Sequence, residues 1–407
     1  MTSTPEETRR TPRSVEDHAT SARQLLEPTL ARLSGNPATA TLDAALGRVL
    51  AAPLAAPLAL PSFDNSQMDG YAARSTELPG ALRVTEPIAA GHTGQAIAAD
   101  PGPGWAVPIM TGAMLPAWAD AVVPVESARP ARFVTAGETI ELPAAPAGQF
   151  VRKRGEDVRA GEEVLPAGTV LGPAQIALLA ALGRAEVAVR QPLRVALLST
   201  GDELVSVGEP LPLGRIYDSN GPMLAAALRD AGAIPQVVRV QDDSPVGLRE
   251  VLAHLEGVDL VLSTGGISQG AFEVVKLGLG TSVEFGAVAM QPGGPQAHGM
   301  VGTADGPVPF LGFPGNPVSS LLSFEVFLRP LLAGSRPRHR LRLAEAVDSP
   351  RAKHQIRRGV VTDDGVRLEG GPGSHLLRAM ALADCLVHLP VGLERAEAGS
   401  EVEVWTL

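Results

Sequence analysis

The first hydrophobic pattern along the chain is helical. Apolar residues recur every three or four positions between residues 15 and 33, namely Ala22, Leu25, Leu26, Leu30 and Leu33. This spacing places them on one face of a helix, so we predict a helix over that range. Thr41 is of a residue type that caps helices, and it predicts a second helix that ends near Ala52.

The pattern changes at Pro61. As far as about Gly148, short segments with alternating apolar residues are separated by proline and glycine, as at 105–110 and 121–125. Such segments are typical of strands joined by tight turns. We therefore predict a separate, mostly β lobe over residues 61–148.

Residues 149–190 combine a turn-rich stretch with a helical one. A helix is predicted from Pro173 to Leu182, and Gly183 follows it as a stop signal. We expect this segment to return to the opening part of the chain. Residues 15–60 and 149–190 would then form one discontinuous N-terminal domain.

Short β-branched segments alternate with helical patterns between residues 191 and 334. The strand-like segments are 193–199, 236–240, 259–262 and 309–313, and the helical ones are 222–230, a stretch that begins at Pro245, and 318–328. Ser244 before Pro245 and Asn316 before Pro317 are typical helix starts. The alternation predicts a parallel α/β sheet. Polar turns that follow its strands share one edge, and open α/β sheets bind ligands at that edge.

The composition changes again after Ala333. Arginine and lysine are frequent as far as Arg358, and strand-like segments then alternate with turns to the end of the chain. We predict a small β domain over residues 335–407. The basic stretch from Arg351 to Arg358 is either a solvated face or a source of cations for an anion site.

Composition limits the classes of protein that fit. A chain of 407 residues with 45% hydrophobic side chains can bury several cores, so two to four domains are expected. Its longest apolar runs are broken by proline and fall short of the ~20 residues that a membrane span needs. No secretory pattern opens the chain, and we expect a cytoplasmic protein without a membrane role. A net charge of −10 argues against nonspecific binding to nucleic acid.

The chain has one cysteine, Cys385. A single cysteine excludes a disulfide within the chain and any site that needs several cysteines for zinc or iron–sulfur ligation. The apolar surroundings of Cys385 favour core packing over a nucleophilic role.

Four turns of the predicted sheet carry candidate chemistry, and each has a purely structural alternative. Gly265-Gly266 with Ser268 can wrap a phosphate, or form only a tight turn. Asp202-Glu203 can hold a divalent metal or accept protons, or begin a helix in solvent. The triplet 218–220 and the stretch 314–317 can bind substrate, or serve only as helix starts. Their convergence on one sheet edge favours the functional interpretation.

Three polar segments outside the sheet are unusual for linkers. They are Phe63 to Ala72, Ile109 to Ala113 and Arg154 to Asp157. The first includes Met68 and Tyr71, which are costly to expose, so this loop is expected to pack against other residues.

Taken in order, these segments resemble the molybdopterin molybdenumtransferases, the family of the bacterial MoeA proteins and the gephyrin E domain. The matching stretches are Asn65 to Ala72, Met110 to Ala113 with Ala119 to Val123, Arg154 to Asp157, Ser199 to Leu204, Ile216 to Asn220, Ser263 to Ser268, and Pro314 to Ser320. Seven ordered motifs over nearly the whole chain make the resemblance specific. Gly373 to Leu377 also resembles a serine-containing turn of the family.

The resemblance implies an α/β multidomain fold: the discontinuous N-terminal domain, the inserted β lobe, a molybdopterin-binding α/β domain over 191–334 and a C-terminal β-barrel-like domain. It also implies a homodimer with sites at the subunit junction. The implied substrates are molybdate and adenylylated molybdopterin, the implied products are molybdenum cofactor and AMP, and Mg²⁺ assists. A molybdopterin adenylyltransferase would act upstream, and molybdoenzymes would receive the product.

The family's site residues can be carried onto matching positions. Catalytic roles are expected for Asp69, Thr111, Asp157, Glu203 and Glu273, and Mg²⁺ ligation is expected for Asp202, Glu203 and Glu273. Substrate binding is expected for Thr200, Gly201, Asp202, Asp218, Ser219, Asn220, Gly265, Gly266, Ser268, Lys276, Pro314, Gly315, Asn316 and Ser374.

Two positions depart from the family pattern. Glu273 stands where the family has aspartate ahead of a lysine, here Lys276. The family's Lys-Pro-Gly-Lys-Pro turn is here Gln291-Pro292-Gly293-Gly294-Pro295, so two cations expected to meet an anionic substrate are absent.

Two other functions stay open on the sequence. The chain could adenylylate molybdopterin, since the enzyme of that step resembles the α/β domain alone. It could also be a non-catalytic paralogue that binds cofactor or scaffolds partners, as the missing lysines permit.

Overall fold

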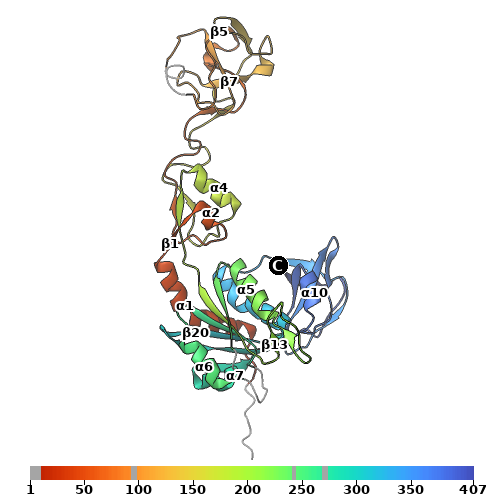
Figure 1. The fold of residues 1–407 in the computed structure, drawn as a ribbon. Coiled ribbons are helices and arrows are strands. Elements are labelled where there is room, and N and C mark those ends of the chain that lie inside the picture. Colours follow the sequence, from red (N-terminus) through yellow and green to blue (C-terminus); the bar gives the residue numbers. More distant parts are fainter. Residues whose placement is uncertain (1–10, 93–98, 241–243, 268–273) are drawn as a thin grey trace, which may run out of the picture. The chain divides into compact units, whose positions relative to one another are not determined.

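The computed structural model describes residues 11–92, 99–240, 244–267 and 274–407. The chain divides into two compact units, each described here by itself. Unit 1 comprises residues 1–38, 47–49 and 189–407, and unit 2 comprises residues 39–46 and 50–188. Figure 1 shows the elements of both units.

The central sheet of unit 1 has six strands in the order β15-β12-β16-β20-β19-β17. These are β15 (Ile234–Arg239), β12 (Arg194–Ser199), β16 (Leu260–Thr264), β20 (Gly306–Phe313), β19 (Pro295–Thr303) and β17 (Val283–Ala287). The first four are parallel, which confirms the predicted α/β architecture. The sheet as a whole is mixed, because β19 returns antiparallel to β20 and β17 pairs antiparallel with β19.

Helices cover both faces of this sheet. They are α1 (Val15–Gly35), α5 (Asn220–Asp230), α6 (Pro245–Ala253), α7 (Val274–Leu279), α8 (Pro317–Ser323), the π-helical turn η4 (Phe324–Leu328), α9 (Arg329–Leu332) and the 3-10 turn η3 (Gly280–Ser282). Val195 and Leu197 of β12 pack with α1, α5 and η4, whereas Ala196 and Leu198 pack with α6 and α7. Figure 1 shows α6 and α7 apart from α5. Alternate strand residues therefore enter two different cores, as expected of a sheet buried on both faces.

Helix starts in unit 1 follow the local sequence. Ser244 accepts a hydrogen bond from the Gly247 amide at 3.0 Å, and Pro245 occupies the first turn of α6. The predicted helix start at Ser244 is thus confirmed. Pro317 likewise begins α8, but the Asn316 side chain makes no capping hydrogen bond.

A second, C-terminal sheet completes unit 1. It has the order β18-β23-β25-β27-β21, and β24 pairs with β23. Its strands are β18 (Met290–Gln291), β21 (Arg338–Arg342), β23 (His354–Thr362), β24 (Gly365–Leu368), β25 (Cys385–Leu389) and β27 (Glu401–Thr406), and the helix α10 (Leu377–Leu382) and the small pair β22 (Val347–Asp348) with β26 (Arg395–Ala396) accompany them. A separate pair, β13 (Leu204–Val205) with β14 (Ile216–Tyr217), lies between β12 and α5. The predicted C-terminal β domain is confirmed.

Cys385 is fully buried in this sheet. Burial raises the pKa of its thiol to about 12, so it stays protonated and packs as a core residue, as the sequence predicts.

Unit 2 contains a five-stranded sheet with the order β7-β4-β6-β5-β8. Its strands are β4 (Gly70–Ala73), β5 (Gly80–Val84), β6 (Trp105–Ile109), β7 (Ala121–Pro124) and β8 (Thr139–Leu142), and the other elements of this unit are β1 (Ala38–Thr41), α2 (Leu42–Ala45), β2 (Leu54–Ala55), β3 (Asn65–Ser66), the 3-10 turns η1 (Ser75–Glu77) and η2 (Val125–Ser127), β9 (Val151–Arg152), β10 (Glu163–Leu165), α4 (Pro173–Ala181) and β11 (Glu186–Val189). Tyr71 is fully buried in the β lobe, which is the packing expected for that loop.

One helix is shorter than the sequence suggests. The pattern after Thr41 predicts a helix to about Ala52, whereas α2 ends at Ala45. Gly47 has φ +75°, a left-handed conformation that ends a helix, and Leu50 and Ala51 use their amides in hydrogen bonds to Thr169 and Ala188.

Across the described ranges, none of the helices is long and apolar enough to cross a membrane. The boundaries of the four predicted domains stay a prediction.

Candidate active site

Four turns of unit 1 meet at the carboxyl ends of β12, β16 and β20, as the sequence predicts for a shared sheet edge. Asn220, the first residue of α5, connects them. Its side-chain amide nitrogen lies 2.8 Å from Thr264 Oγ1 and 2.6 Å from the Gly315 carbonyl oxygen. The Asn220 side chain therefore joins three segments that are far apart in sequence.

Close packing of glycines brings two of these turns into contact. A Cβ placed on Gly315 would lie 3.4 Å from the Gly265 Cα, and one placed on Gly266 would lie 3.2 Å from Thr200 Oγ1. Gly265 and Gly266 have φ of +89° and +68°, which favour glycine. Side chains at these positions would separate the turns after β12, β16 and β20.

The amides of the glycine turn are not equivalent. The Gly265 amide donates to the Phe313 carbonyl at 3.1 Å and is committed to holding the turn. The expected phosphate site, in which both glycine amides contribute, therefore retains the amide of Gly266 but not that of Gly265. The carbonyl of Gly266 accepts from the Lys276 amide at 3.3 Å, so α7 begins beside the turn, with the Lys276 side chain exposed.

Asp218 caps the start of α5, a role that the sequence suggests for Ser219 or Asn220. Its carboxylate accepts from Ser199 Oγ at 2.7 Å and from the Gly221 amide at 2.9 Å. Ser219 makes no capping hydrogen bond with its side chain. The start of α5 is thus held by Asp218, and Asn220 is left to connect the turns.

Asp202 and Glu203 lie on the exposed turn after β12. The Glu203 carboxylate lies over Gly201, because a Cβ on Gly201 would come within 2.6 Å of Glu203 Oε2. Gly201 has φ +134°. The lack of a side chain at Gly201 therefore allows this carboxylate to approach the backbone of the turn.

Two buried polar atoms near this edge have no partner among the described residues: Asn220 Oδ1, at the start of α5, and Ser263 Oγ, within β16. Buried polar groups in proteins are nearly always hydrogen-bonded, so the unpaired Asn220 Oδ1 among these turns indicates a place for a polar ligand or water.

The Ser374 turn joins this edge from the C-terminal sheet. The Ser374 carbonyl accepts from the Val318 amide at 3.2 Å, two residues after Asn316. The carbonyl of Pro314, the first residue of the turn 314–317, accepts a hydrogen bond from Ser320 Oγ. Ser374 and the segment 314–316 are thus neighbours.

Sequence reasoning missed the role of two arginines behind the Ser374 turn. Arg358 is fully buried and Arg357 is 7% exposed, so neither belongs to a solvated basic face. Arg357 donates to the Gly370 carbonyl at 2.8 Å, and Arg358 donates to the Gly371 carbonyl. Burial lowers the pKa of both guanidinium groups.

These arginines keep unused donors. Arg357 Nε, Arg358 Nε and Arg358 Nη1 are buried and lack partners within the described part of the chain. A buried cation without a carboxylate is costly unless an anion approaches it. The burial of two adjacent arginines cannot be predicted from their sequence alone. The pattern therefore left open whether this basic stretch is a solvated face or a source of cations.

Gln291 and Gly294 take the places of the two expected lysines. Gln291 Oε1 accepts from Gln355 Nε2 at 2.8 Å, and a Cβ on Gly294 would meet only ordinary contacts, the nearest being the Val288 carbonyl oxygen at 3.5 Å. Gln291 pairs with Gln355 on β23, two residues before Arg357.

Three predicted residues lie in unit 2. Asp69 accepts from the amide and the hydroxyl of Thr111 at 2.6 and 2.8 Å, and these hydrogen bonds lower the pKa of its carboxyl. Asp157 lines a concave surface with Gly155 and Glu162, and neither Asp69 nor Thr111 is among the described residues that line it. The structure thus brings Asp69 and Thr111 together.

Ser268 and Glu273 lie outside the described residues. Within the described ranges, no three histidine, cysteine or acidic side chains gather as metal ligands.

Comparisons with known proteins give matches along the chain. Residues 13–183 match the model of the MoeA N-terminal region (domain I and II). Residues 196–334 match a probable molybdopterin binding domain, and residues 340–407 match the MoeA C-terminal region (domain IV).

Curated relatives match over most of their length. Molybdopterin molybdenumtransferase 2 of Mycobacterium tuberculosis is 40% identical over 97% of this chain and 100% of its own. The molybdopterin molybdenumtransferase of Haemophilus influenzae is 35% identical over 89% and 92%.

Solved structures share the fold. A molybdopterin biosynthesis MoeA protein from Pyrococcus horikoshii OT3 covers 95% of this chain and 99% of its own with a TM-score of 0.77 at 24% identity. Another solved structure of a molybdopterin biosynthesis MoeA protein, also from Pyrococcus horikoshii, gives a TM-score of 0.70 at 30% identity and covers 94% of this chain and 98% of its own.

Proposed function

This chain belongs to the MoeA family of molybdopterin molybdenumtransferases, and we propose that it acts on adenylylated molybdopterin at the carboxyl edge of its α/β sheet. It is a transferase of molybdenum cofactor biosynthesis that inserts molybdenum into molybdopterin. The proposal concerns the form of the substrate, the residues that hold it and the release of AMP.

The observation that carries the proposal is the junction of turns around Asn220. Its amide links Thr264 and Gly315, while its buried Oδ1 has no partner among the described residues. An acceptor held in this way can take an N–H or O–H group of a pterin or ribose. Gly266 and Thr200 at the same junction offer an amide and a hydroxyl to phosphate oxygens.

The reaction divides into two parts. Water attacks the adenylyl phosphorus of adenylylated molybdopterin, the P–O–P link breaks with the molybdopterin phosphate as the leaving group, and AMP carries the new P–O bond. Glu203, exposed on its turn, would accept the proton of that water. Molybdate, the second substrate, forms two Mo–S bonds with the dithiolene sulfurs and gives up one oxygen, which leaves as water with the two thiol protons.

Mg²⁺ fits as an ion shared between protein and substrate. Proteins commonly hold Mg²⁺ with one or two carboxylates plus substrate phosphates, and Asp202 and Glu203 offer two carboxylates on one turn. Glu273 would be a third ligand. Bound there, the ion would neutralise charge on the phosphoanhydride oxygens.

Two arginines and one lysine would supply the positive charge for the anionic substrates in place of the two absent lysines. Arg357 and Arg358 lie behind the Ser374 turn with unused donors, and Lys276 lies beside the glycine turn. This supports a working anion site, although Gln291 and Gly294 are neutral.

We also propose that the active unit is a cytoplasmic homodimer. Asp69 and Thr111 belong to unit 2 and the turns around Asn220 belong to unit 1. In the proposed dimer, the Asp69 region of one subunit completes the site of the other. A molybdopterin adenylyltransferase would supply the substrate, and molybdoenzymes would take the product.

One incubation tests the function. Pure protein with adenylylated molybdopterin, molybdate and Mg²⁺ is expected to release AMP and form molybdenum cofactor. ATP-dependent adenylylation of free molybdopterin would instead indicate the preceding enzyme, and binding without AMP release would indicate a scaffold. The curated relatives from Mycobacterium tuberculosis and Haemophilus influenzae are named as molybdenumtransferases and do not favour either alternative.

A further inference from the structure

A cavity lies at the amino edge of the central sheet, opposite the edge of the candidate active site. It is lined by residues that directly precede strands, Leu193 before β12 and Ala233 before β15. The turns of the candidate active site follow the carboxyl ends of the same sheet. This cavity, called the amino-edge pocket here, is therefore separate from the site of the proposed reaction.

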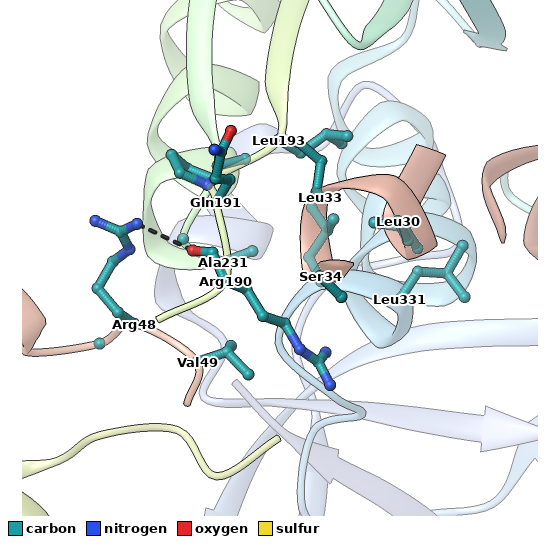
Figure 2. Close-up of a pocket in the computed structure, with 15 residues that line it drawn as sticks. Leu30, Leu33, Ser34, Arg48, Val49, Arg190, Gln191, Leu193, Ala231 and Leu331 are labelled. Atoms are coloured by element: carbon teal, nitrogen blue, oxygen red, sulfur yellow. Dashed lines mark hydrogen bonds between the residues drawn. The ribbon is translucent and has the colours of Figure 1, made fainter. Parts of the chain in front are cut away.

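The amino-edge pocket has a cavity volume of about 90 Å³. Its lining is Leu30, Leu33, Ser34, Gly47, Arg48, Val49, Arg190, Gln191, Pro192, Leu193, Ala231, Gly232, Ala233, Leu331 and Leu332. Side chains from α1 and α9 form an aliphatic wall. Figure 2 shows Leu30, Leu33 and Leu331 on one side of the pocket.

Two arginines give the pocket its charge, and no acidic side chain is among its described lining residues. Arg48 donates to the Arg190 carbonyl at 3.0 Å, which fixes the two segments to each other. Arg190 Nε is buried and has no hydrogen-bond partner among the described residues. In Figure 2 the Arg190 side chain extends past Val49, on the side of Ser34 and Leu331.

An aliphatic wall beside an unpaired guanidinium group selects for a particular ligand. The arginine donors favour a carboxylate, which accepts from a planar guanidinium group through two oxygens. The leucines favour a hydrocarbon chain, and the volume limits that chain to a few carbons. We propose that the amino-edge pocket binds a short-chain aliphatic carboxylate, independently of the molybdenum reaction.

The position of the pocket gives such binding a consequence. The segments 47–49 and 190–193 lie where the chain leaves unit 1 for unit 2 and returns. A ligand held by the Arg190 side chain beside Val49 would stabilise both segments, because Arg48 ties segment 47–49 to the Arg190 carbonyl. Their backbone amides should then exchange hydrogen more slowly.

The test titrates sodium pentanoate, as the probe, into the full chain, and isothermal titration calorimetry measures the binding. We expect one saturable site with a Kd of about 1 mM or tighter, a range open to a ligand of this size. Pentanol lacks the carboxylate and pentylammonium reverses the charge, so both should bind at least about tenfold more weakly. Hydrogen exchange should slow in peptides that contain residues 30–34, 47–49 and 190–193.

Variants locate the site. Arg190→Gln should weaken pentanoate binding about tenfold or more, because it removes the charged donor. Arg184→Gln, a change at an exposed arginine outside the pocket, should leave binding unchanged. If Arg190→Gln does not fold, Arg48→Gln and the comparison of pentanoate with pentanol decide.

Three results would overturn the proposal. They are no saturable binding of pentanoate to the folded protein, equal binding of pentanoate and acetate, and unchanged affinity in both arginine variants. The arginines would then serve only to neutralise the carbonyl ends of α1 and α9, which end beside the pocket.

Discussion

The Asn220 side chain donates to the Gly315 carbonyl oxygen at 2.6 Å and so ties the start of α5 to the turn after β20. The same nitrogen reaches Thr264 Oγ1 at 2.8 Å, at the end of β16. One amide therefore sets the spacing of the turns after β16 and β20. Ser219, next to it in sequence, makes no such contact with its side chain.

Replacing Asn220 by alanine should lower activity more than stability. Loss of two hydrogen bonds at a half-buried position costs about 1–3 kcal/mol in the free energy of unfolding. Turnover should fall at least about tenfold, since the turns lose their common tie. Urea unfolding and AMP release measure the two effects. Gln236→Ala, a change at an exposed amide of the same unit, is the control and should change neither; an Asn220→Ala protein with full turnover would remove Asn220 from the site.

Glu203→Gln tests the proposed proton acceptor. The amide keeps the shape of the side chain over Gly201 but cannot accept a proton or hold Mg²⁺ well. We expect most turnover to be lost while the Kd for adenylylated molybdopterin stays within a few fold. Glu209→Gln, another exposed acid of the same unit, should keep full activity. Undiminished AMP release by Glu203→Gln would contradict the role of this residue.

Mixed dimers test whether sites are shared between subunits. Asp69→Ala and Glu203→Ala should each be inactive as homodimers. Refolded together, they should regain part of the activity, because one of the two sites in a heterodimer contains both native residues. AMP release is measured after the heterodimer has been isolated by two different affinity tags. An inactive heterodimer would place Asp69 and Glu203 of one chain in the same site.

Local features of this fold are predictable from sequence, whereas its long-range placements are not. Ser244 and Pro245 start α6 because capping depends on a few adjacent residues. Asn220 has the sequence signature of a cap, yet it connects turns some 44 and 95 residues away, and Asp218 holds the helix start instead. Which neighbour takes which role depends on the strands that surround them.

Burial of charge is the least predictable part. Arg357 and Arg358 stand in a basic stretch that reads equally well as a solvated face. They are buried because β23 lies between β18 and β25, and strand order is decided by contacts far apart in sequence. The Ser374 turn, by contrast, is recognisable from its glycine and serine residues.

Two buried histidines should make the fold sensitive to acid. Burial lowers the pKa of His18 and of His388 to about 3 from an ordinary 6.5. Below pH 6.5 the unfolded chain binds a proton at each position and the folded chain does not, so stability is full above pH 6.5 and is lost as pH falls toward 3. Each histidine should cost about 2 kcal/mol between pH 6.5 and pH 5.

Urea unfolding at the two pH values measures this loss. His388→Gln removes one of the titrating groups and should reduce the loss of stability by the share of that histidine, about 2 kcal/mol. His92→Gln, at an exposed position, should leave it unchanged. A pH dependence that is the same in His388→Gln as in the native protein would show that His388 is not kept neutral by the fold.

The last prediction concerns the two neutral residues of the Gln291–Pro295 turn. Molybdate and the pterin phosphate are anions, so each missing cation should weaken binding unless others substitute, by about 1–3 kcal/mol in total. Arg357, two residues beyond the Gln355 that pairs with Gln291, is the nearest buried substitute along the strand. We expect the native protein to bind molybdate through such arginines, with a lower affinity than a site that also carries the two lysines of the family pattern.

Gln291→Lys combined with Gly294→Lys should therefore tighten molybdate binding. Position 294 accepts a Cβ with contacts no closer than 3.5 Å, so the second lysine should not strain the turn. The matched control is Gln291→Glu with Gly294→Glu, which places the opposite charge at the same two positions and should weaken binding. Titration of molybdate against the formation of molybdenum cofactor measures both, and Arg357→Gln in the native background should raise the molybdate concentration needed for half-maximal insertion. If neither charge pair changes that concentration while Arg357→Gln does, molybdate binds at the arginines and not at the turn, because a charge change within a few ångströms of a bound anion must alter its affinity.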